Sequence, residues 1–499
     1  MDIGIWNLLG IILIIALIIG VGIYSGKMVS DASDFDTGGG KAGPWIVCGA
    51  IMGSLVSGQA TIGTAQLAFE YGMSAWWFTL GSGIGCLILA IGYVIPLRHS
   101  GSVTLLEVIG KEYGAKAEYA GSVLCSIGIF ISVIAQVLSS CALLTVIFHM
   151  NFLTAAILSI TVMVAYVVFG GAWGAGMGGV VKLILLYGAS ILGLGIVLTG
   201  SHGPMALIGQ LQTTLAGTDV GSLAGLATAE EVSGRYLSLF SRGFLKDMGS
   251  GLSLLLGVLA TQTYAQAIWS AKSDSKARKG AMLSAVLIPP IGIACIFIGM
   301  FMRNHCLTTA EITALTEAGK SIPEGMLEIT SSSQVFPAFV INYMPKFVAG
   351  IVLGTLLITV IAGGAGLSLG VASILVNDIF CKLSKGLADV KKKLYTTRVT
   401  IVVTLCAAAA IALIVPGAII NDFGFLSMGI RGTVVFIPLT CALFAKGKVA
   451  PWAVLVSMAA GPAAVLGGNL LGLPFDSLFL GIAVCLVIIG VGTAVGKRQ

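Results

Sequence analysis

The stretch GPWIVCGAIMGSLVSGQATIGTAQLAFEYG, residues 43–72, decides the fold. It is apolar enough to cross a bilayer, yet its middle carries small and polar residues from Gly53 to Thr61. Backbone that leaves the helix survives at membrane depth only where it is buried in protein or lines a cavity, and its freed carbonyls and amides can hold a solute or an ion. We therefore interpret the stretch as a broken helix at a transport site, and we expect residues 53–59 to be non-helical and to face a central cavity together with residues 256–262. The alternative is an unbroken helix whose small residues pack closely against a neighbour.

Composition places this stretch in a polytopic membrane protein. Of the 499 residues, 57% are hydrophobic and only 10% are charged, and the mean hydropathy is +1.03. A chain of that composition lacks the polar residues that cover a soluble globule. Residues 1–24 form an apolar run without a basic start, so we interpret them as a first membrane helix rather than a cleaved signal peptide. The net charge of +6 requires no nucleic-acid partner.

Apolar segments of roughly 20 residues predict an all-α fold with about 13 transmembrane helices. They lie at residues 4–24, 44–70, 75–96, 120–148, 152–170, 176–200, 249–270, 281–302, 347–377, 397–415, 424–445, 452–471 and 475–496. Lysine and arginine concentrate in alternate connections, which is the positive-inside pattern. We therefore expect a multi-pass protein of the cell (cytoplasmic) membrane, surrounded by the lipid bilayer, with its N-terminus outside, its C-terminus in the cytoplasm, and external connections at 201–248 and 303–346.

A second polar span, GSGLSLLLGVLATQTYAQAIWS at residues 249–270, resembles the first in design. Gly257 lies in its middle, and polar residues follow from Thr261 to Gln266. Two polar, glycine-interrupted spans at matching places in two halves indicate an inverted-repeat transporter with its site at mid-membrane. We expect a single membrane transport domain with a leading helix and loop (1–43), a first repeat (44–200), an external loop (201–248), a second repeat (249–445) and trailing helices (446–499).

Five stretches together resemble the sodium/solute symporter family, of the solute carrier family 5 type. They are GTAQLAFEYGMSAWWFTLG (63–81), VTLLEVIGKEYG (103–114), AKSDSKARKGA (271–281), LGVASILVNDIF (369–380) and IPLTCALFAKGKVAPWA (437–453). Their order and spacing match the family over nearly the whole chain. The resemblance implies a LeuT-type fold with two inverted five-helix repeats and alternating access around a central site. Members of the family are sodium-coupled importers of sugars, amino acids, carboxylates, vitamins or urea.

The resemblance also implies an ion site, and this chain departs from the family there. The backbone oxygens and hydroxyls that hold sodium fall on Gly53, Val56, Thr359, Ala362 and Gly363. The last two positions carry hydroxyls in the family and none here. A helix-5 carboxylate that supports a second sodium ion in some members falls on Gly179. A hard cation needs several oxygen ligands, so we expect this pocket to bind sodium poorly.

Lys182 lies three residues beyond Gly179 and therefore on the same helix face. We expect its ammonium to replace the missing sodium ion, with the carbonyls of Gly53 and Val56 as acceptors. The carrier would then be sodium-independent, either proton-coupled through Lys182 or a uniporter or exchanger with a fixed charge, because desolvation disfavours the charged ammonium. One alternative is a lysine that extends back to the cytoplasmic surface, which returns the protein to conventional sodium-coupled symport.

The candidate solute-binding residues are polar side chains on three core helices. They are Ser54, Ser57, Gln59, Thr61, Gln136, Ser139, Ser140, Thr261 and Gln262. None is charged, which favours a small polar solute that is neutral, zwitterionic or held by helix-end dipoles. Sugar-binding members of the family carry polar residues where this chain has Leu254 and Gly257, which disfavours a sugar. The alternative for each side chain is an interhelical hydrogen bond of about 0.6 kcal/mol.

Other chemistries lack support in the residues. We find no nucleophile with a base and no buried carboxylate pair, so we expect no enzyme activity. The four histidines lack metal-ligand spacing, and nearly all ten cysteines lie in apolar segments, so we expect no metal, no cofactor and no disulfide framework. Trp76 and Trp77 are candidates for aromatic gates or for membrane-interface anchors. A membrane solute sensor is a third alternative, and the end of the chain shortly after the last span counts against it.

Overall fold

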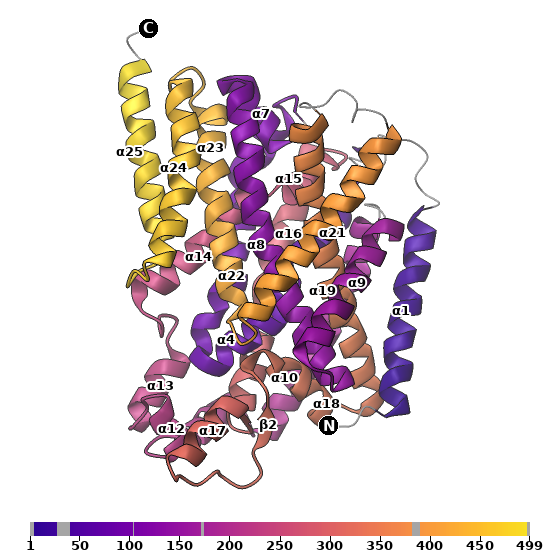
Figure 1. Cartoon of the computed structure of the whole chain (residues 1–499), viewed down its shortest axis with the longest axis vertical. Helices are drawn as coiled ribbons and strands as arrows, with labels where there is room; N and C mark the ends of the chain where they lie inside the picture. Colours follow the sequence, from indigo (N-terminus) through magenta and orange to yellow (C-terminus); the bar gives the residue numbers. More distant parts are fainter. Residues whose placement is uncertain (1–3, 27–39, 103, 171–173, 382–389, 497–499) are drawn as a thin grey trace.

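The computed structural model describes residues 4–26, 40–102, 104–170, 174–381 and 390–496. Long helices run side by side along the molecule, and short elements gather at one end of it (Figure 1). Helices cover each of the predicted apolar segments, so the expected all-α membrane fold is confirmed. The helix α1 begins at the end where α13 and α17 lie, whereas α25 ends at the opposite end (Figure 1).

The first part of the chain contains a broken helix and the long helices that follow it. Its elements are α1 (Ile5–Gly26), α3 (Pro44–Leu55), η2 (Gln59–Gly63), α4 (Thr64–Tyr71), η3 (Gly72–Trp76), α5 (Trp77–Ile88), η4 (Leu89–Tyr93), α6 (Val94–Arg98), α7 (Leu105–Tyr113), α8 (Ala115–Phe148), α9 (Phe152–Gly170) and α10 (Gly174–Gly200). Pro44 begins α3, a position where its missing N–H is not needed. The Thr104 side chain caps α7 by accepting a hydrogen bond from Glu107 N.

The second part repeats the pattern of a broken helix followed by long helices. Its elements are α14 (Phe244–Leu259), α15 (Gln262–Trp269), α16 (Asp274–Arg303), α19 (Lys346–Ile374), η6 (Leu375–Phe380), α21 (Val390–Ile414), α22 (Ile420–Arg431), η8 (Gly432–Phe436), α23 (Ile437–Phe444), α24 (Pro451–Leu470) and α25 (Leu478–Gly496). The most apolar window of α8 is 78% buried, against 28% for α25. The helix α8 is therefore central and α25 peripheral.

The short elements belong to the two long connections. They are α11 (Pro204–Leu215), α12 (Asp219–Leu223), α13 (Ala229–Leu237), β1 (Cys306–Thr308), α17 (Thr309–Glu317), β2 (Leu327–Ile329), η5 (Ser332–Gln334) and α18 (Val335–Tyr343). The strands β1 and β2 pair in parallel. Capping boxes at Thr228 with Glu231 and at Thr308 with Glu311 start α13 and α17.

Nine helical stretches of the described chain are long and apolar enough to cross a membrane, or ten if the bent pair α14 and α15 is one span. One of the nine, Gln59–Arg98, is 40 residues long. A straight helix of that length would measure about 60 Å, twice the hydrocarbon core. The positive φ of 60° at Gly72 turns the chain within it. Three further apolar helices are shorter, at Ile5–Leu17, Pro44–Leu55 and Phe152–Tyr166.

Both polar spans are broken, and each break lies within the region that the sequence pointed to but is shorter than it. We expected residues 53–59 to be non-helical, whereas α3 continues to Leu55 and the irregular backbone covers 56–58. In the second span the break lies at residues 260–261, with a bend of 44°. Gly257 stays inside α14 because it serves close packing: a Cβ there would lie 2.5 Å from Met428 Cβ.

Candidate functional site

The first break is held between the central helix and α19. At Gly58 a Cβ would lie 2.5 Å from Ser139 Cβ on α8 and 2.9 Å from Val360 Cγ2 on α19. Real side chains do not approach that closely, so this position requires glycine in the observed packing. The backbone of the break is thereby pressed against both helices.

A hydrogen bond joins the first break to α8, and packing brings α19 to the same place. Gln136 Nε2 donates to Ser57 Oγ at 2.7 Å, and Thr61 Oγ1 donates to Ser57 O at 3.1 Å. A Cβ at Gly363 would lie 3.4 Å from both Gln136 Oε1 and Ser57 Cβ, so α19 contacts this pair. The predicted residues Ser57, Gln136 and Gly363 therefore come together at the break, although they are far apart in the sequence.

Three buried polar atoms around the break have no hydrogen-bond partner among the described residues. They are Gln59 Nε2, Gln136 Oε1 and Thr359 Oγ1. An unpaired buried donor or acceptor costs about 1–3 kcal/mol. The three atoms supply one donor, one acceptor and one hydroxyl, which a polar solute can satisfy.

The Lys182 ammonium donates to a backbone carbonyl that has lost its helical hydrogen-bond donor at the break. In an unbroken helix Gly53 O would accept from Ser57 N, but Ser57 N donates to Leu55 O instead, at 3.0 Å. Lys182 Nζ donates to Gly53 O at 2.7 Å. The Lys182 residue is only 7% exposed. Among the described residues Lys182 Nζ donates to Gly53 O and makes no bond to the expected Val56 carbonyl.

A pair of glycines brings Lys182 to that carbonyl. A Cβ at Gly179 would lie 2.3 Å from Gly49 O, so α10 and α3 touch backbone to backbone there. Lys182 and Gly53 lie about one turn further along their helices than this contact. The close approach also leaves no room for a carboxylate side chain at Gly179 in this packing.

At the second break, Thr261 contacts an arginine that sequence reasoning missed. Thr261 Oγ1 donates to Gly257 O at 2.6 Å and accepts from Arg431 Nη1 at 3.0 Å. Arg431 lies at the end of α22 and is 2% exposed. A signal was present in the sequence, because Arg431 is the only charged residue between Asp422 and Lys446. A charged residue inside an apolar span is usually functional.

Other predicted solute ligands engage neighbouring helices or their own helix. Gln262 Oε1 accepts from Leu105 N at 2.9 Å, and Ser140 Oγ accepts from Ser159 Oγ on α9 at 2.8 Å. Ser139 Oγ donates to Ala135 O at 2.8 Å. Ser54 is exposed and donates to Ala50 O at 2.6 Å. The Ala362 residue of the expected sodium pair is half-buried on α19.

The two tryptophans pack against the protein. Trp76 Nε1 donates to Pro289 O at 3.1 Å and Trp77 Nε1 donates to Leu239 O at 2.7 Å. Trp77 also stacks near Phe240, with ring centroids 5.8 Å apart. Their polar atoms thus bind α16 and the segment before α14.

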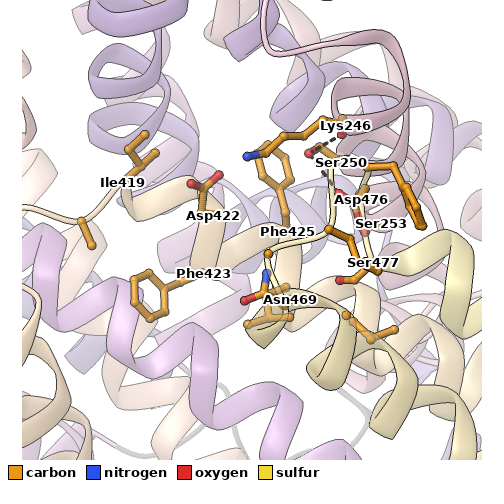
Figure 2. A pocket seen from close by; sticks show the side chains of 17 residues that line it. Lys246, Ser250, Ser253, Ile419, Asp422, Phe423, Phe425, Asn469, Asp476 and Ser477 are labelled. Atoms are coloured by element: carbon orange, nitrogen blue, oxygen red, sulfur yellow. Dashed lines mark hydrogen bonds between the residues drawn. The ribbon is translucent and has the colours of Figure 1, made fainter.

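A cavity of about 370 Å³ lies beside the start of α22, between α14 and the connection from α24 to α25. Figure 2 shows Lys246, Asp422, Phe425 and Asp476 around it. Burial raises the pKa of the Asp476 carboxyl. Next to Phe425, a Cβ at Gly424 would lie 3.4 Å from Gln59 Nε2, so a single layer of α22 separates the cavity from the first break.

An ion-pair cluster stands next to this cavity. Arg242 Nε donates to Asp247 Oδ1 at 2.7 Å, and Arg242 Nη1 to Asp422 Oδ1 at 3.0 Å. The Arg242 guanidinium also lies over the Phe425 ring, 5.3 Å from its centroid. The cluster thus fixes the start of α22 to the start of α14.

Comparison with known proteins agrees with this geometry. The profile of the family described as "Sodium:solute symporter family" matches residues 35–461. The chain belongs to the sodium:solute symporter family. As a member of a transporter family it is a secondary solute transporter and not an enzyme, and the resemblance described above is confirmed.

Relatives in this symporter family are distant. The chain is 24% identical over 389 residues to the uncharacterized symporter YwcA of Bacillus subtilis, a match that covers 77% of this chain and 70% of that protein. It is 22% identical over 430 residues to the high-affinity choline transporter 1 of Drosophila melanogaster, a match that covers 83% of this chain and 63% of the relative. The chain thus spans less than two thirds of the choline transporter's length.

Solved structures show the fold. A Na⁺-coupled sialic acid symporter, solved in a substrate-bound outward-open state, superposes with a TM-score of 0.72 at 17% identity and covers 100% of this chain and 99% of that one. Mhp1, a nucleobase-cation-symport-1 family transporter, superposes with a TM-score of 0.53 at 13% identity, covering 94% and 96%. This chain therefore has the expected LeuT-type fold.

Proposed function

We propose that this protein imports a small polar organic solute by alternating access and that the Lys182 ammonium takes the place of a sodium ion. The observation that carries the proposal is the 2.7 Å hydrogen bond from Lys182 Nζ to Gly53 O. In the family, the carbonyl at this position is one of the sodium ligands. In this protein the helix break leaves that carbonyl without a backbone donor, and the Lys182 ammonium binds it in place of the sodium ion.

Electrostatic repulsion prevents a charged Lys182 and a sodium ion from occupying this site together. Two unit charges about 4 Å apart repel by about 4 kcal/mol at the effective dielectric of protein sites, which weakens binding by about a thousandfold. The side-chain ligands are also missing, because Ala362 and Gly363 carry no hydroxyl. Transport is therefore sodium-independent. It is coupled to protons if Lys182 loses its proton in the cycle, and is uniport or exchange if Lys182 keeps it.

The same proposal includes the arrangement of the chain. Each half, 44–200 and 249–445, starts with a broken helix, and the solute site lies where the two breaks meet α8 and α19. Support comes from the shared contacts of Ser57 with Gln136 and of Thr261 with the α22 arginine. The solute-binding residues with free or reachable polar groups are Ser57, Gln59, Gln136 and Thr261, and Thr359 joins them through its unpartnered hydroxyl.

Sodium itself is the probe for the first test. Unfolding temperature is measured while sodium replaces potassium at constant ionic strength. A bound ion present at a hundredfold excess over its Kd stabilises by about 2.7 kcal/mol. We expect no sodium-specific stabilisation of the wild type and a clear one in the triple variant Lys182→Met, Ala362→Ser and Gly363→Ser. Sodium stabilisation of the wild type would overturn the assignment of Lys182.

Conventional sodium-coupled symport is the second candidate, favoured by membership of the family. Uptake into proteoliposomes separates the two, once a thermal-shift panel has supplied a solute. Lys182→Met and Lys182→Gln should lose coupling to a pH gradient or lose uptake, and Lys182→Arg, which keeps the charge, serves as the control. Wild-type rates in all three variants would favour the sodium-coupled candidate.

A further inference from the structure

Arg431 is a cation in the middle of a membrane helix with only neutral partners. It lies about 17 Å along the helix from Ile420, well inside a hydrocarbon core of about 30 Å. Its guanidinium donates to Thr261 Oγ1 at 3.0 Å, Ser132 Oγ at 3.2 Å, Ser427 Oγ at 3.0 Å and Ser427 O at 3.3 Å. These are four bonds, and a guanidinium has five N–H donors.

The surrounding protein supplies no negative charge to Arg431. Within the described ranges, no carboxylate oxygen lies within 4 Å of it. Asp247, an acidic residue with no exposed surface, is paired with Arg242 instead. Lys182 likewise bonds a carbonyl. The two broken helices are therefore flanked by two buried cations that pair with no carboxylate of the described residues, and burying an unpaired ion is strongly unfavourable.

Arg431 is also connected to both breaks. It touches the second break directly, through Thr261. Its partner Ser132 lies one helical turn from Gln136 on the same face of α8, and Gln136 bonds Ser57 in the first break. The polar face of α8 thus runs from the guanidinium to the proposed solute site.

A second buried donor, the side-chain amide of Gln59, lies against α22 and lacks an acceptor among the described residues. Gln59 Nε2 is buried without a partner in the described chain, and Gly424, seven residues before Arg431 on α22, lies against it. Positions seven apart share a helix face. An amide donor and a guanidinium therefore lie on the same side of α22, about 10 Å apart along its axis, and each can donate to a solute oxygen.

We propose that the solute carries a carboxylate and that Arg431 recognises it. The proposal rests on the transport function proposed above and names the solute class of that same site. Arginine and carboxylate pair through two parallel, charge-assisted hydrogen bonds. When the anion binds, the guanidinium exchanges hydrogen bonds to the hydroxyls of Ser132, Thr261 and Ser427 for bonds to the carboxylate. The charge of the solute compensates the buried cation. Of the solutes that the sequence favoured, a zwitterion or an anion held by helix-end dipoles can carry this group, whereas a neutral solute cannot.

The test compares acids with their amides. Purified protein in a sodium-free potassium buffer is titrated with a panel of short monocarboxylates, each paired with its primary amide, and the unfolding temperature is measured. The pairs match in shape and differ in charge. We expect at least one carboxylate to stabilise the protein and to bind about tenfold or more tightly than its amide. Amides that bind as tightly, or a panel without any stabilising carboxylate, would overturn the proposal.

Variants then assign the effect to the guanidinium. Arg431→Gln should remove the preference for the acid over the amide, whereas Arg431→Lys should keep part of it. If neither variant folds, the wild-type comparison decides alone. Repeating the titration in sodium buffer and with Lys182→Met separates the two proposals. Acid preference that requires sodium contradicts the role of Lys182 and leaves that of Arg431 standing, whereas equal binding of acid and amide contradicts Arg431 whatever sodium does.

Discussion

The first break depends on a glycine, Gly58, which has no side chain. Gly58 lies where a Cβ would overlap Ser139 and Val360, so Gly58→Ala must push α8 or α19 away from the break. Overpacking of this kind costs about 1–3 kcal/mol. We expect a lower unfolding temperature and a loss of transport larger than the loss of folded protein, because Ser57 and Gln136 would separate.

The control for Gly58→Ala is Gly188→Ala in α10, where a Cβ would meet no atom within 4 Å. Alanine there should be neutral or slightly stabilising, since it is the better helix former. If Gly58→Ala behaved like Gly188→Ala in both stability and uptake, the packing of the break described above would be wrong.

Individual side chains differ in how far the sequence predicts them. Lys182 was singled out because a charge inside an apolar segment is rare and because Gly179, the position of the family's helix-5 carboxylate, lies three residues away. Arg431 is also a charge inside an apolar segment, so the same rule predicts that it is functional. The sequence proposed two acceptors for Lys182, the carbonyls of Gly53 and Val56, and the structure shows the bond to Gly53 O. The choice depends on which carbonyl loses its helical donor, and Ser57 N leaves Gly53 O by donating to Leu55 O.

Broken helices were predictable as elements, and their boundaries were not. Glycine and polar residues within an apolar span indicate a break, but glycine also permits close packing. Gly257 serves the second purpose, against Met428 of α22. That neighbour is far away in sequence, so local pattern could not distinguish the two uses. Likewise α3 keeps helical bonding to its end, where Val56 N donates to Met52 O at 2.8 Å.

A glutamine fastens α4 to the elements near α22. Gln66 is fully buried, its Nε2 donates to Ser332 Oγ at 3.3 Å and Ala418 O at 3.1 Å, and its Oε1 accepts from Ile420 N at 3.0 Å. We predict that Gln66→Leu speeds hydrogen exchange in peptides that cover 415–421. Two of these bonds hold residues 415–421, and each contributes about 1 kcal/mol, so their loss should accelerate local opening by about tenfold or more.

Gln212→Leu provides the matched control for this measurement. Gln212 Nε2 bonds Ser233 Oγ at 2.7 Å within the α11–α13 layer. Its replacement should leave exchange at 415–421 unchanged. Unchanged exchange in Gln66→Leu as well would show that other contacts hold α4 against α22.

At the scale of the whole molecule, orientation follows from charge. The connection between α15 and α16 carries Lys272 and continues into Lys276, Arg278 and Lys279, whereas residues 416–423 and 472–474 contain no lysine or arginine. Basic residues stay in the cytoplasm during insertion. The end of the molecule where α25 ends should therefore be cytoplasmic, and the end with α13 and α17 external (Figure 1).

Reporter fusions in a bacterial host test this orientation. Green fluorescent protein fused after residue 499 should fluoresce, because it folds in the cytoplasm, and alkaline phosphatase fused there should be inactive. Phosphatase fused after residue 225, between α12 and α13, should be active, because that connection is expected outside. The reversed pattern would place the basic connections outside the cell, against the charge rule. Lys182, on a helix whose N-terminal end would then face outward, would enter the transport cycle from the opposite side of the membrane.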